Sequence, residues 1–206
     1  MMGIGVATAA AGIIVGTVTL TGLSGRFIEL IEIISLGNVV LMLLLTALCS
    51  LVLGMGLPTT ANYIVMATLT APVIVALGGK SGLVVPMLAA HLFVFYFGIL
   101  ADDTPPVGLA AFAASAIAKS DPIQTGIQGF VYDLRTAILP FVFIFNLEIL
   151  MIGGLTEDGN IIWINDIFKI GWICFSALIA MFAFASALQG FFVDKCNILE
   201  RGFLIL

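Results

Sequence analysis

The sequence predicts an all-α membrane protein, and three observations carry that prediction. Hydrophobic residues make up 62% of the 206 residues and charged residues only 9%, which leaves too little polar surface for a soluble globule of this size. Runs without Asp, Glu, Lys or Arg cover residues 1–25, 37–79, 81–101 and 170–193, and each can hold a membrane-spanning helix of about 20 residues. These runs are continuously apolar and do not alternate as barrel strands do.

The charge and the reactive residues exclude several classes of function. A formal net charge of −5, with lysine and arginine scattered singly, gives no basic patch, so we expect no nucleic-acid partner. His91 is the single histidine and lacks partners at metal-ligand spacing, so we expect it to be structural. The three cysteines are far apart and are predicted to be small buried hydrophobes: Cys49, Cys174 and Cys196. The sequence therefore predicts no organic cofactor and no resident metal.

The first 36 residues are predicted to form a transmembrane helix and an amphipathic connecting arm. Glycines within residues 22–25 end the first span. The charged residues of the next segment stand at helical spacing, opposite isoleucine and leucine: Arg26, Glu29 and Glu32. This pattern is typical of a helix that lies along the membrane surface.

Residues 37–79 are predicted to form a helical hairpin. A single helix of this length would measure about 65 Å, roughly twice the thickness of a hydrocarbon core. The turn falls within residues 54–62, GMGLPTTAN, where glycine and proline break the helix. Because this tip carries hydroxyl groups but no charge, we expect a re-entrant hairpin whose backbone and helix ends can bind a small cation or an anionic group. A plain transmembrane hairpin with a tight turn is the alternative.

Residues 81–118 are predicted to form a broken helix, because two carboxylates and two prolines interrupt an apolar run at residues 101–108, ADDTPPVG. An ionised carboxylate near the bilayer centre costs at least a few kcal/mol, and proline lacks a backbone N–H. Such a break persists only inside protein or beside water. Asp102 and Asp103 can serve as cation ligands or as a proton acceptor, since neighbouring carboxylates raise each other's proton affinity. The alternative is an ordinary Asp-Pro turn in water.

The last part of the chain, residues 119–206, is predicted to hold a polar connector and C-terminal transmembrane helices. Four segments follow one another: a connector over 119–135, a span over 136–152, a polar hairpin-like loop over 153–169 and a span over 170–189. The distribution of lysine and arginine, by a small excess, places Lys119 on the cytoplasmic side.

The two interrupted stretches carry a family resemblance when they are taken together. They read GMGLPTTANYIVMATLTAPVIVALGG and HLFVFYFGILADDTPPVGLAAFAAS. Over residues 1–153 the chain resembles the large membrane subunit of tripartite ATP-independent periplasmic (TRAP) transporters, and within them the fused permease of the TAXI branch. The resemblance implies an elevator-type secondary transporter, of which residues 37–118 are one transport-domain repeat and the chain is the C-terminal half.

The resemblance also implies a function, a location and partners. It implies ion-coupled uptake of a small organic anion across the cell inner membrane, with an extracytoplasmic solute-binding protein that delivers the anion. The remainder of the permease, a first repeat and a small membrane subunit, would complete the transporter within the lipid bilayer. The alternatives are a passive scaffold subunit and an intramembrane enzyme that uses Asp102 and Asp103. Aspartyl catalysis needs carboxylates that converge from separate elements, so we expect no enzyme activity.

Carried over by motif position, the resemblance assigns two sets of site residues. The predicted ion-binding residues are Gly54, Met55, Gly56, Thr59, Ala101, Asp102, Asp103 and Thr104. The predicted substrate-binding residues are Thr60, Asn62, Pro105 and Pro106. Family members often have uncharged residues where the two aspartates stand, which keeps both Na⁺ and H⁺ open as the coupling ion. We expect the hairpin tip and the helix break to meet and to share that ion.

Overall fold

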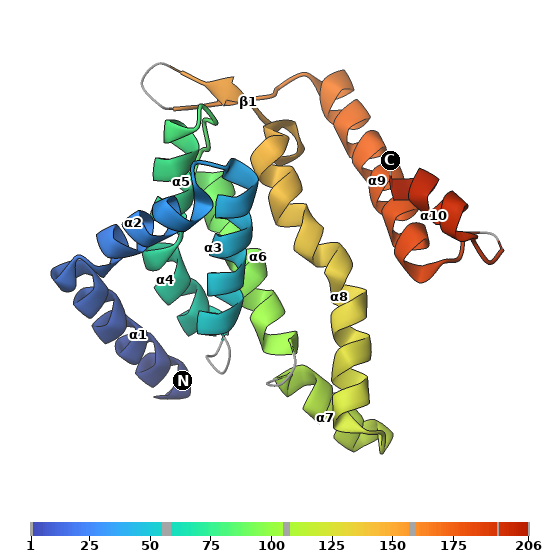
Figure 1. Cartoon of the computed structure of the whole chain (residues 1–206), viewed down its shortest axis with the longest axis horizontal. Helices are drawn as coiled ribbons and strands as arrows, with labels where there is room; N and C mark the ends of the chain where they lie inside the picture. Colours follow the sequence, from blue (N-terminus) through green and yellow to red (C-terminus); the bar gives the residue numbers. More distant parts are fainter. Residues whose placement is uncertain (1, 55–58, 105–107, 157–159, 193, 206) are drawn as a thin grey trace. The chain divides into compact units, whose positions relative to one another are not determined.

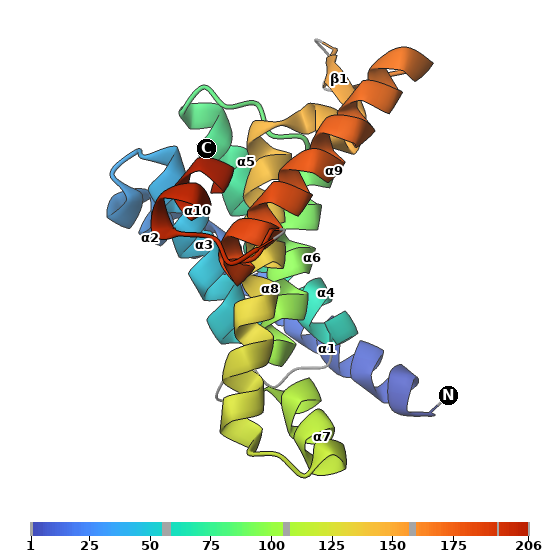
Figure 2. The same ribbon diagram turned by 90° about the vertical axis from the view of Figure 1, so that its right-hand side faces the viewer.

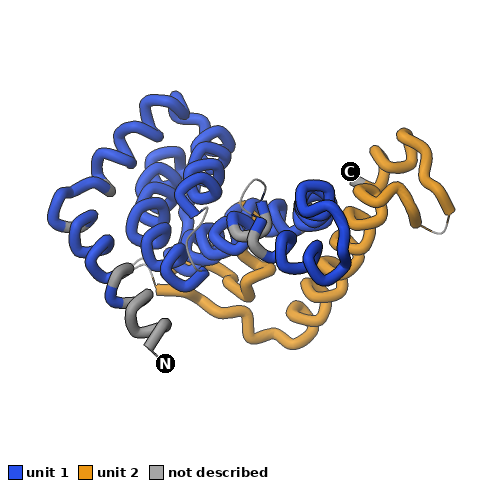
Figure 3. Tube along the Cα trace, turned by 90° about the horizontal axis from the view of Figure 1, so that it is seen from below, with its two compact units in different colours: residues 1–144 blue, residues 145–206 orange. Residues whose placement is uncertain are grey.

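The computed structural model covers the whole chain and describes all residues except 1, 55–58, 105–107, 157–159, 193 and 206. The chain divides into two compact units, Met1–Ile144 and Phe145–Leu206 (Figure 3). Helices form nearly all of the described secondary structure, and one two-stranded sheet accompanies them. The prediction of an all-α membrane protein is confirmed.

The first unit begins with two helices, α1 (Met2–Thr21) and α2 (Leu23–Ser35). The boundary between them is Gly22, whose φ of 64° lies in the left-handed region that glycine enters without a steric penalty. The predicted amphipathic arm is therefore a helix, and it starts directly after this glycine. Ile31 of α2 is buried, whereas Glu32 is half-buried and forms an ion pair with Lys80 at 2.6 Å between Nζ and Oε1.

The predicted reversal within residues 37–79 is present. Helix α3 (Val39–Gly54) forms the first arm, and α4 (Thr59–Leu69) and α5 (Ala71–Lys80) form the second. Both halves of the second arm contact α3, and α1 packs along α4 (Figure 1). Asn38 caps α3, since its Oδ1 accepts hydrogen bonds from the backbone N–H groups of Val40 and Leu41. The second arm is interrupted at Thr70, just before Pro72, which cannot donate a backbone hydrogen bond.

The predicted broken helix is present, but its first half is shorter than expected. Helix α6 (Met87–Asp103) begins after Pro86, and residues 81–86 form a turn and an extended segment. After the interruption, α7 (Leu109–Ala118) resumes behind Gly108, whose φ is 32°. The helices α3, α4 and α6 contact one another and lie close together in both side views (Figures 1 and 2).

The core of the first unit lies between the hairpin and α6. Its fully buried side chains come from α3, α4, α5 and α6: Leu43, Met66, Val73, Ile74, Phe93 and Val94. Burial of such side chains stabilises a helix pair by roughly 1.5–3 kcal/mol for each residue, although in lipid the gain comes from close packing more than from leaving water. This packing holds α6 against the hairpin, and thereby fixes where the two interrupted regions lie.

One helix covers most of the connector (119–135) and the first part of the span (136–152) that the sequence predicts, and the predicted span is wrong beyond residue 145, where a 3-10 turn and the first strand follow. Helix α8 (Pro122–Phe145) runs from one segment into the other and contains Pro140. Asp121 Oδ1 accepts a hydrogen bond from the Gln124 backbone N–H at 2.9 Å, which caps the helix start. Near the other end, Phe141 makes an edge-to-face contact with Phe93 of α6, with ring centroids 5.3 Å apart. The polar residues 119–135 therefore include the start of a helix.

The second unit contains a short hairpin and two helices. It consists of η1 (Leu147–Leu150), β1 (Ile152–Leu155), β2 (Ile161–Trp163), α9 (Ile167–Gln189) and α10 (Ile198–Ile205). The strands pair antiparallel, with Ile152 opposite Trp163, so the predicted hairpin-like loop is confirmed. Lys169 and Glu148 form an ion pair at 2.7 Å. Cys174 of α9 is exposed, so the expectation that all three cysteines are buried is wrong.

Within the described residues, three segments are long and apolar enough to cross a membrane. They are Thr59–Lys80, Pro122–Phe145 and Ile167–Gln189, with mean hydropathies of 1.7, 1.3 and 2.0. The segments differ in burial. Of the 18 consecutive residues that are most apolar, 61% are buried inside the protein in the first segment, but only 6% in the third. Two shorter apolar helices, Val39–Gly54 and Met87–Ala101, accompany them. This set of helices is that of a multi-pass membrane protein.

Candidate ion and solute site

The buried side chain of Asn62 joins the hairpin to α6. Asn62 lies in the first turn of α4 and has no solvent-exposed surface. Its Nδ2 donates a hydrogen bond to the backbone carbonyl of Gly98 in α6, at 2.9 Å. Its Oδ1 has no hydrogen-bond partner among the residues that the structure describes. A buried acceptor of this kind costs about 1–3 kcal/mol when nothing donates to it, and it therefore marks a position that a ligand can stabilise.

Small residues allow the helices to approach one another around Asn62. Gly54 is the last residue of α3, and a Cβ added there would overlap the Asn62 amide and stand 2.8 Å from Ala101 Cβ. A Cβ at Gly98 would stand 3.4 Å from Asn62 Nδ2. The end of α3, the start of α4 and the end of α6 therefore meet here, and the structure brings together Gly54, Asn62 and Ala101 of the predicted site.

A second polar contact joins α4 to α6, about two helical turns before Gly98 along α6. Tyr63 Oη and His91 Nδ1 are 2.9 Å apart, and the Tyr63 ring also packs edge-to-face on Phe95, with centroids 5.6 Å apart. The sequence predicts a structural role for His91, and this contact is consistent with one. The two neighbouring residues Asn62 and Tyr63 thus fasten α4 to α6 at two levels.

Helix α6 extends into the predicted break, so that Asp102 and Asp103 belong to its last turn. Ala101, Asp102 and Asp103 are the last residues of the helix, and Thr104 is the first residue beyond it, with extended backbone angles (φ −80°, ψ 126°). Ala101 is fully buried. Thr104 Oγ1 donates a hydrogen bond to the Leu100 carbonyl at 2.6 Å, and its oxygen can still accept. The side chains of Asp102 and Asp103 lie outside the described part of the chain, as do Pro105 and Pro106 entirely.

The hairpin tip is described in part. Met55 and Gly56 lie outside the described residues, while Thr59 and Thr60 are exposed and open helix α4. Helix starts carry backbone N–H groups without intrahelical partners and a partial positive charge. The described part of α4 thus begins with two hydroxyl side chains, those of Thr59 and Thr60.

The donor atoms of this region suit a hard cation. The described residues supply amide, hydroxyl and backbone carbonyl oxygens, which Na⁺ and similar ions prefer over the nitrogen and sulfur ligands of transition metals. No group of three or more His, Cys, Asp or Glu residues that could hold a metal ion occurs in the described parts of the chain.

Apolar spanning helices, two interrupted segments and a buried polar contact between α4 and α6 define a multi-pass helical membrane protein. Residues 1–157 match the family model of the tripartite ATP-independent periplasmic transporter, DctM component, and the chain belongs to this family. No curated protein and no solved structure matches the chain. The family comprises transporter components and not enzymes, and a component of a tripartite transporter works with further components.

Sequence reasoning did not single out Gly98. It lies three residues before Ala101 on α6, and both residues are buried on the side that faces the hairpin. Small residues let helices approach closely in membranes. The small size of Gly98 in an otherwise bulky helix is a weak signal, and only its contact with Asn62 gives it a role.

Proposed function

We propose that this chain is the C-terminal half of a TAXI-type fused TRAP permease that couples the uptake of a small organic anion to an ion gradient. The observation that carries the proposal is the buried Asn62 Oδ1, an acceptor without a partner among the described residues, between the hairpin and α6. The first repeat and the small membrane subunit complete the permease in the cell inner membrane. An extracytoplasmic solute-binding protein delivers the anion.

The ion site in this proposal uses oxygens from both interruptions. The ion-binding residues are Gly54, Met55, Gly56, Thr59, Ala101, Asp102, Asp103 and Thr104. Asn62 was expected to bind the solute, but because its side chain is fully buried we assign its oxygen to the ion. Thr60, in the first turn of α4, remains a candidate for the solute, as do Pro105 and Pro106. Re-entrant geometry of the hairpin would place both ligands at membrane depth.

Ion binding and solute binding are coupled in this proposal because the ligands of the ion come from two elements, the hairpin and α6. An ion held by the hairpin and by the end of α6 stabilises the arrangement in which the two lie together. If the solute needs that same arrangement, each ligand raises the affinity for the other by the same factor. Na⁺ fits the oxygen ligands, and Asp102 or Asp103 can instead carry H⁺.

The test is uptake by the complete transporter in lipid vesicles with its solute-binding protein. Labelled organic acids are supplied under an imposed Na⁺ gradient, an imposed proton gradient, or neither. We expect accumulation that depends on one gradient and on the binding protein. Accumulation that persists after both gradients are collapsed would contradict ion coupling. A passive scaffold subunit would instead tolerate substitutions at Gly56, Thr59 and Thr104 without loss of uptake.

A further inference from the structure

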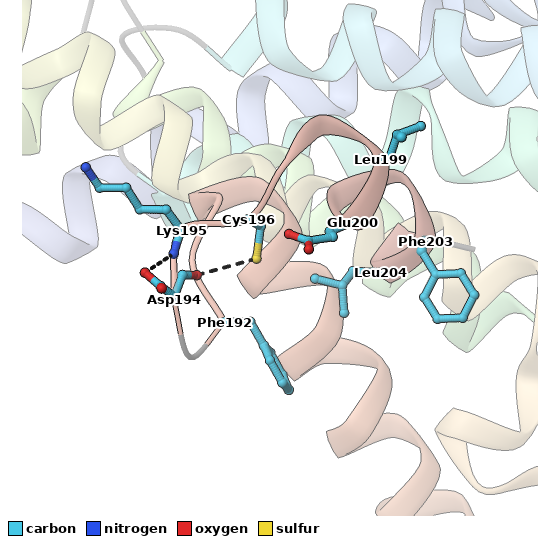
Figure 4. Close-up of a pocket in the computed structure, with 8 residues that line it drawn as sticks. All are labelled: Phe192, Asp194, Lys195, Cys196, Leu199, Glu200, Phe203 and Leu204. Carbon is cyan, nitrogen blue, oxygen red and sulfur yellow. Dashed lines mark hydrogen bonds between the residues drawn. The ribbon is translucent and has the colours of Figure 1, made fainter.

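The polar groups in the hollow between α9 and α10 are supplied with partners without a ligand. In Figure 4, the Asp194 carboxylate accepts a hydrogen bond from the backbone N–H of Lys195 at 2.7 Å, and the Asp194 carbonyl accepts one from the Cys196 thiol. The side chains of Asp194 and Lys195 are also exposed, so water can supply further partners. Asn62 Oδ1 differs, because it is closed off from solvent and no residue that the structure describes donates to it.

The Gly98 carbonyl fixes which way the Asn62 amide points. A carbonyl oxygen only accepts hydrogen bonds, so it must face the amide nitrogen, which donates to it at 2.9 Å. Rotation of the amide by half a turn would bring two oxygens together and remove a buried hydrogen bond, which is unfavourable away from water. The amide oxygen is therefore held away from the Gly98 carbonyl before any ligand binds.

The missing side chain at Gly98 gives Asn62 room to reach that carbonyl. A Cβ at Gly98 would stand 3.4 Å from Asn62 Nδ2 and 3.8 Å from its Cγ, which is contact without overlap. A Cβ that carries two methyl groups, as in valine, has little rotamer freedom in a helix and would crowd the amide. Gly98 thus acts on Asn62 twice, through its carbonyl and through its small size.

An oxygen held in this way discriminates between ligands by charge. It can accept from a hydrogen-bond donor or coordinate a cation, but it repels a carboxylate. The discrimination is stronger in a buried site than in water, because the low dielectric constant strengthens both attraction and repulsion. The helices also close tightly here, since a Cβ at Gly54 would overlap the amide. The position beside Asn62 Oδ1 is therefore suited to one class of ligand.

We propose that Gly98 makes the position beside Asn62 selective for a cation and closes it to the carboxylate of the solute. This inference rests on the proposed function, in which the cation is the coupling ion. Gly98 is a positioning residue, because it acts through the Asn62 amide and does not have to touch the ion. Its effect is to keep the ion and the organic anion at separate places, so that the two do not compete.

The test measures ion binding by the full chain in mild detergent, without transport. The unfolding temperature is recorded in LiCl, NaCl, KCl or choline chloride at equal ionic strength. We expect an alkali cation to raise the unfolding temperature of the unchanged protein, increasingly with its concentration. Gly98→Val should weaken the apparent affinity for that cation about tenfold, whereas Gly98→Ala should keep it. Gly129→Val is the matched control, because a Cβ at Gly129 meets no atom within 4 Å.

The variants are judged by the cation-dependent rise and not by the unfolding temperature itself. A Gly98→Val protein that is less stable but keeps the full rise would show a purely structural role and overturn the inference, while the proposed ion coupling would stand. Gly98→Ser, one atom larger than the alanine variant, covers the case in which the valine variant does not fold, and should weaken the affinity by a smaller factor.

Two further results would also overturn the inference. Choline acetate tests the exclusion of carboxylates: it should stabilise the unchanged protein no more than choline chloride does. Stabilisation by acetate that Asn62→Leu removes would show that the position admits an anion. Absence of a rise with every cation would show that Asn62 holds no ion, and uptake that still depends on a gradient would then assign the coupling ion to another site.

Discussion

Gly54 has so little space that a single methyl group should disturb the candidate site. A Cβ there overlaps the Asn62 amide and approaches Ala101 Cβ. Gly54→Ala should therefore destabilise the protein by about 1–3 kcal/mol, as overpacking does, and should abolish uptake. The check is thermal unfolding in detergent together with vesicle uptake. Gly79→Ala is the matched control, because a Cβ at Gly79 meets no atom within 4 Å. Equal behaviour of the two variants would show that the contact is unimportant.

Asn62 allows the ion and solute roles to be separated at one residue. Asn62→Ala removes the bond to the Gly98 carbonyl and the free oxygen together. We expect it to raise the concentration of coupling ion needed for half-maximal uptake more than the solute KM, with the opposite ranking for Thr60→Ala. Tyr63→Phe is the control, since it removes only the contact with His91. A solute KM that rises alone in Asn62→Ala would contradict the assignment to the ion.

The sequence identifies the residues near each interruption but not which of them touch. Gly54 and Asn62 stand beside a proline and glycine break, and Ala101 stands beside two aspartates, so chemistry alone singles them out. Their contact depends on the tilt and rotation of α3, α4 and α6, which packing between helices sets. Gly98 was missed for the same reason, since only its distance to Asn62 gives it meaning.

Packing, and not charge, should hold the arm α2 to the hairpin. The ion pair between Glu32 and Lys80 is largely exposed, and such pairs contribute about 0–1 kcal/mol. Ile31, in contrast, is 1% exposed, and truncation of a buried isoleucine costs about 2–5 kcal/mol. Ile31→Ala should therefore lower the free energy of unfolding in detergent far more than Glu32→Gln. Similar losses from both variants would show that the ion pair holds α2 against the hairpin as strongly as packing does.

Helix α8 shows why element boundaries resist prediction from sequence. Residues 119–135 are polar, and a polar stretch between apolar runs indicates a connector. The structure instead gives the stretch an Asp121 cap and sets its polar groups along one side of a continuous helix. Among them, Gln124, Gln128 and Tyr132 recur every four residues and line one shallow groove. The sequence thus contains a helical period, but its polar composition indicates a connector more strongly than the period indicates a helix.

The order of helices along the chain predicts which turns lie on opposite sides of the membrane. The turn after α5 and the turn after α7 are joined by α6, the interruption and α7, so they should lie on opposite sides of the bilayer. Ser81→Cys and Ser120→Cys, each in a protein whose three native cysteines are replaced by Ala, should react with a membrane-impermeant maleimide from opposite sides. We expect Ser120→Cys to react from the cytoplasm. Labelling of both positions from one side would contradict a broken helix that crosses the membrane.

At the scale of the molecule, the fold class follows from the sequence because hydrophobicity is a local property. The reversal near Gly54 and the interruption near Thr104 follow from glycine and proline, whose backbone limits are also local. The attachment of α10 to α9 does not, because it depends on a contact between Arg201 and carbonyls more than ten residues away. Breaks caused by glycine and proline can thus be predicted from the sequence, whereas the packing partners of each helix cannot.

The contrast in burial between Thr59–Lys80 and α9 also bears on how the chain enters the membrane during synthesis. Helix α9 is apolar around its whole circumference and can leave the translocation channel for lipid alone. The segment Thr59–Lys80 carries Asn62 and Thr70 inward and has most of its surface covered by neighbours. It gains stability in lipid only once α3 and α6 are beside it. We therefore expect the hairpin to reach its final packing only after the ribosome has delivered α6.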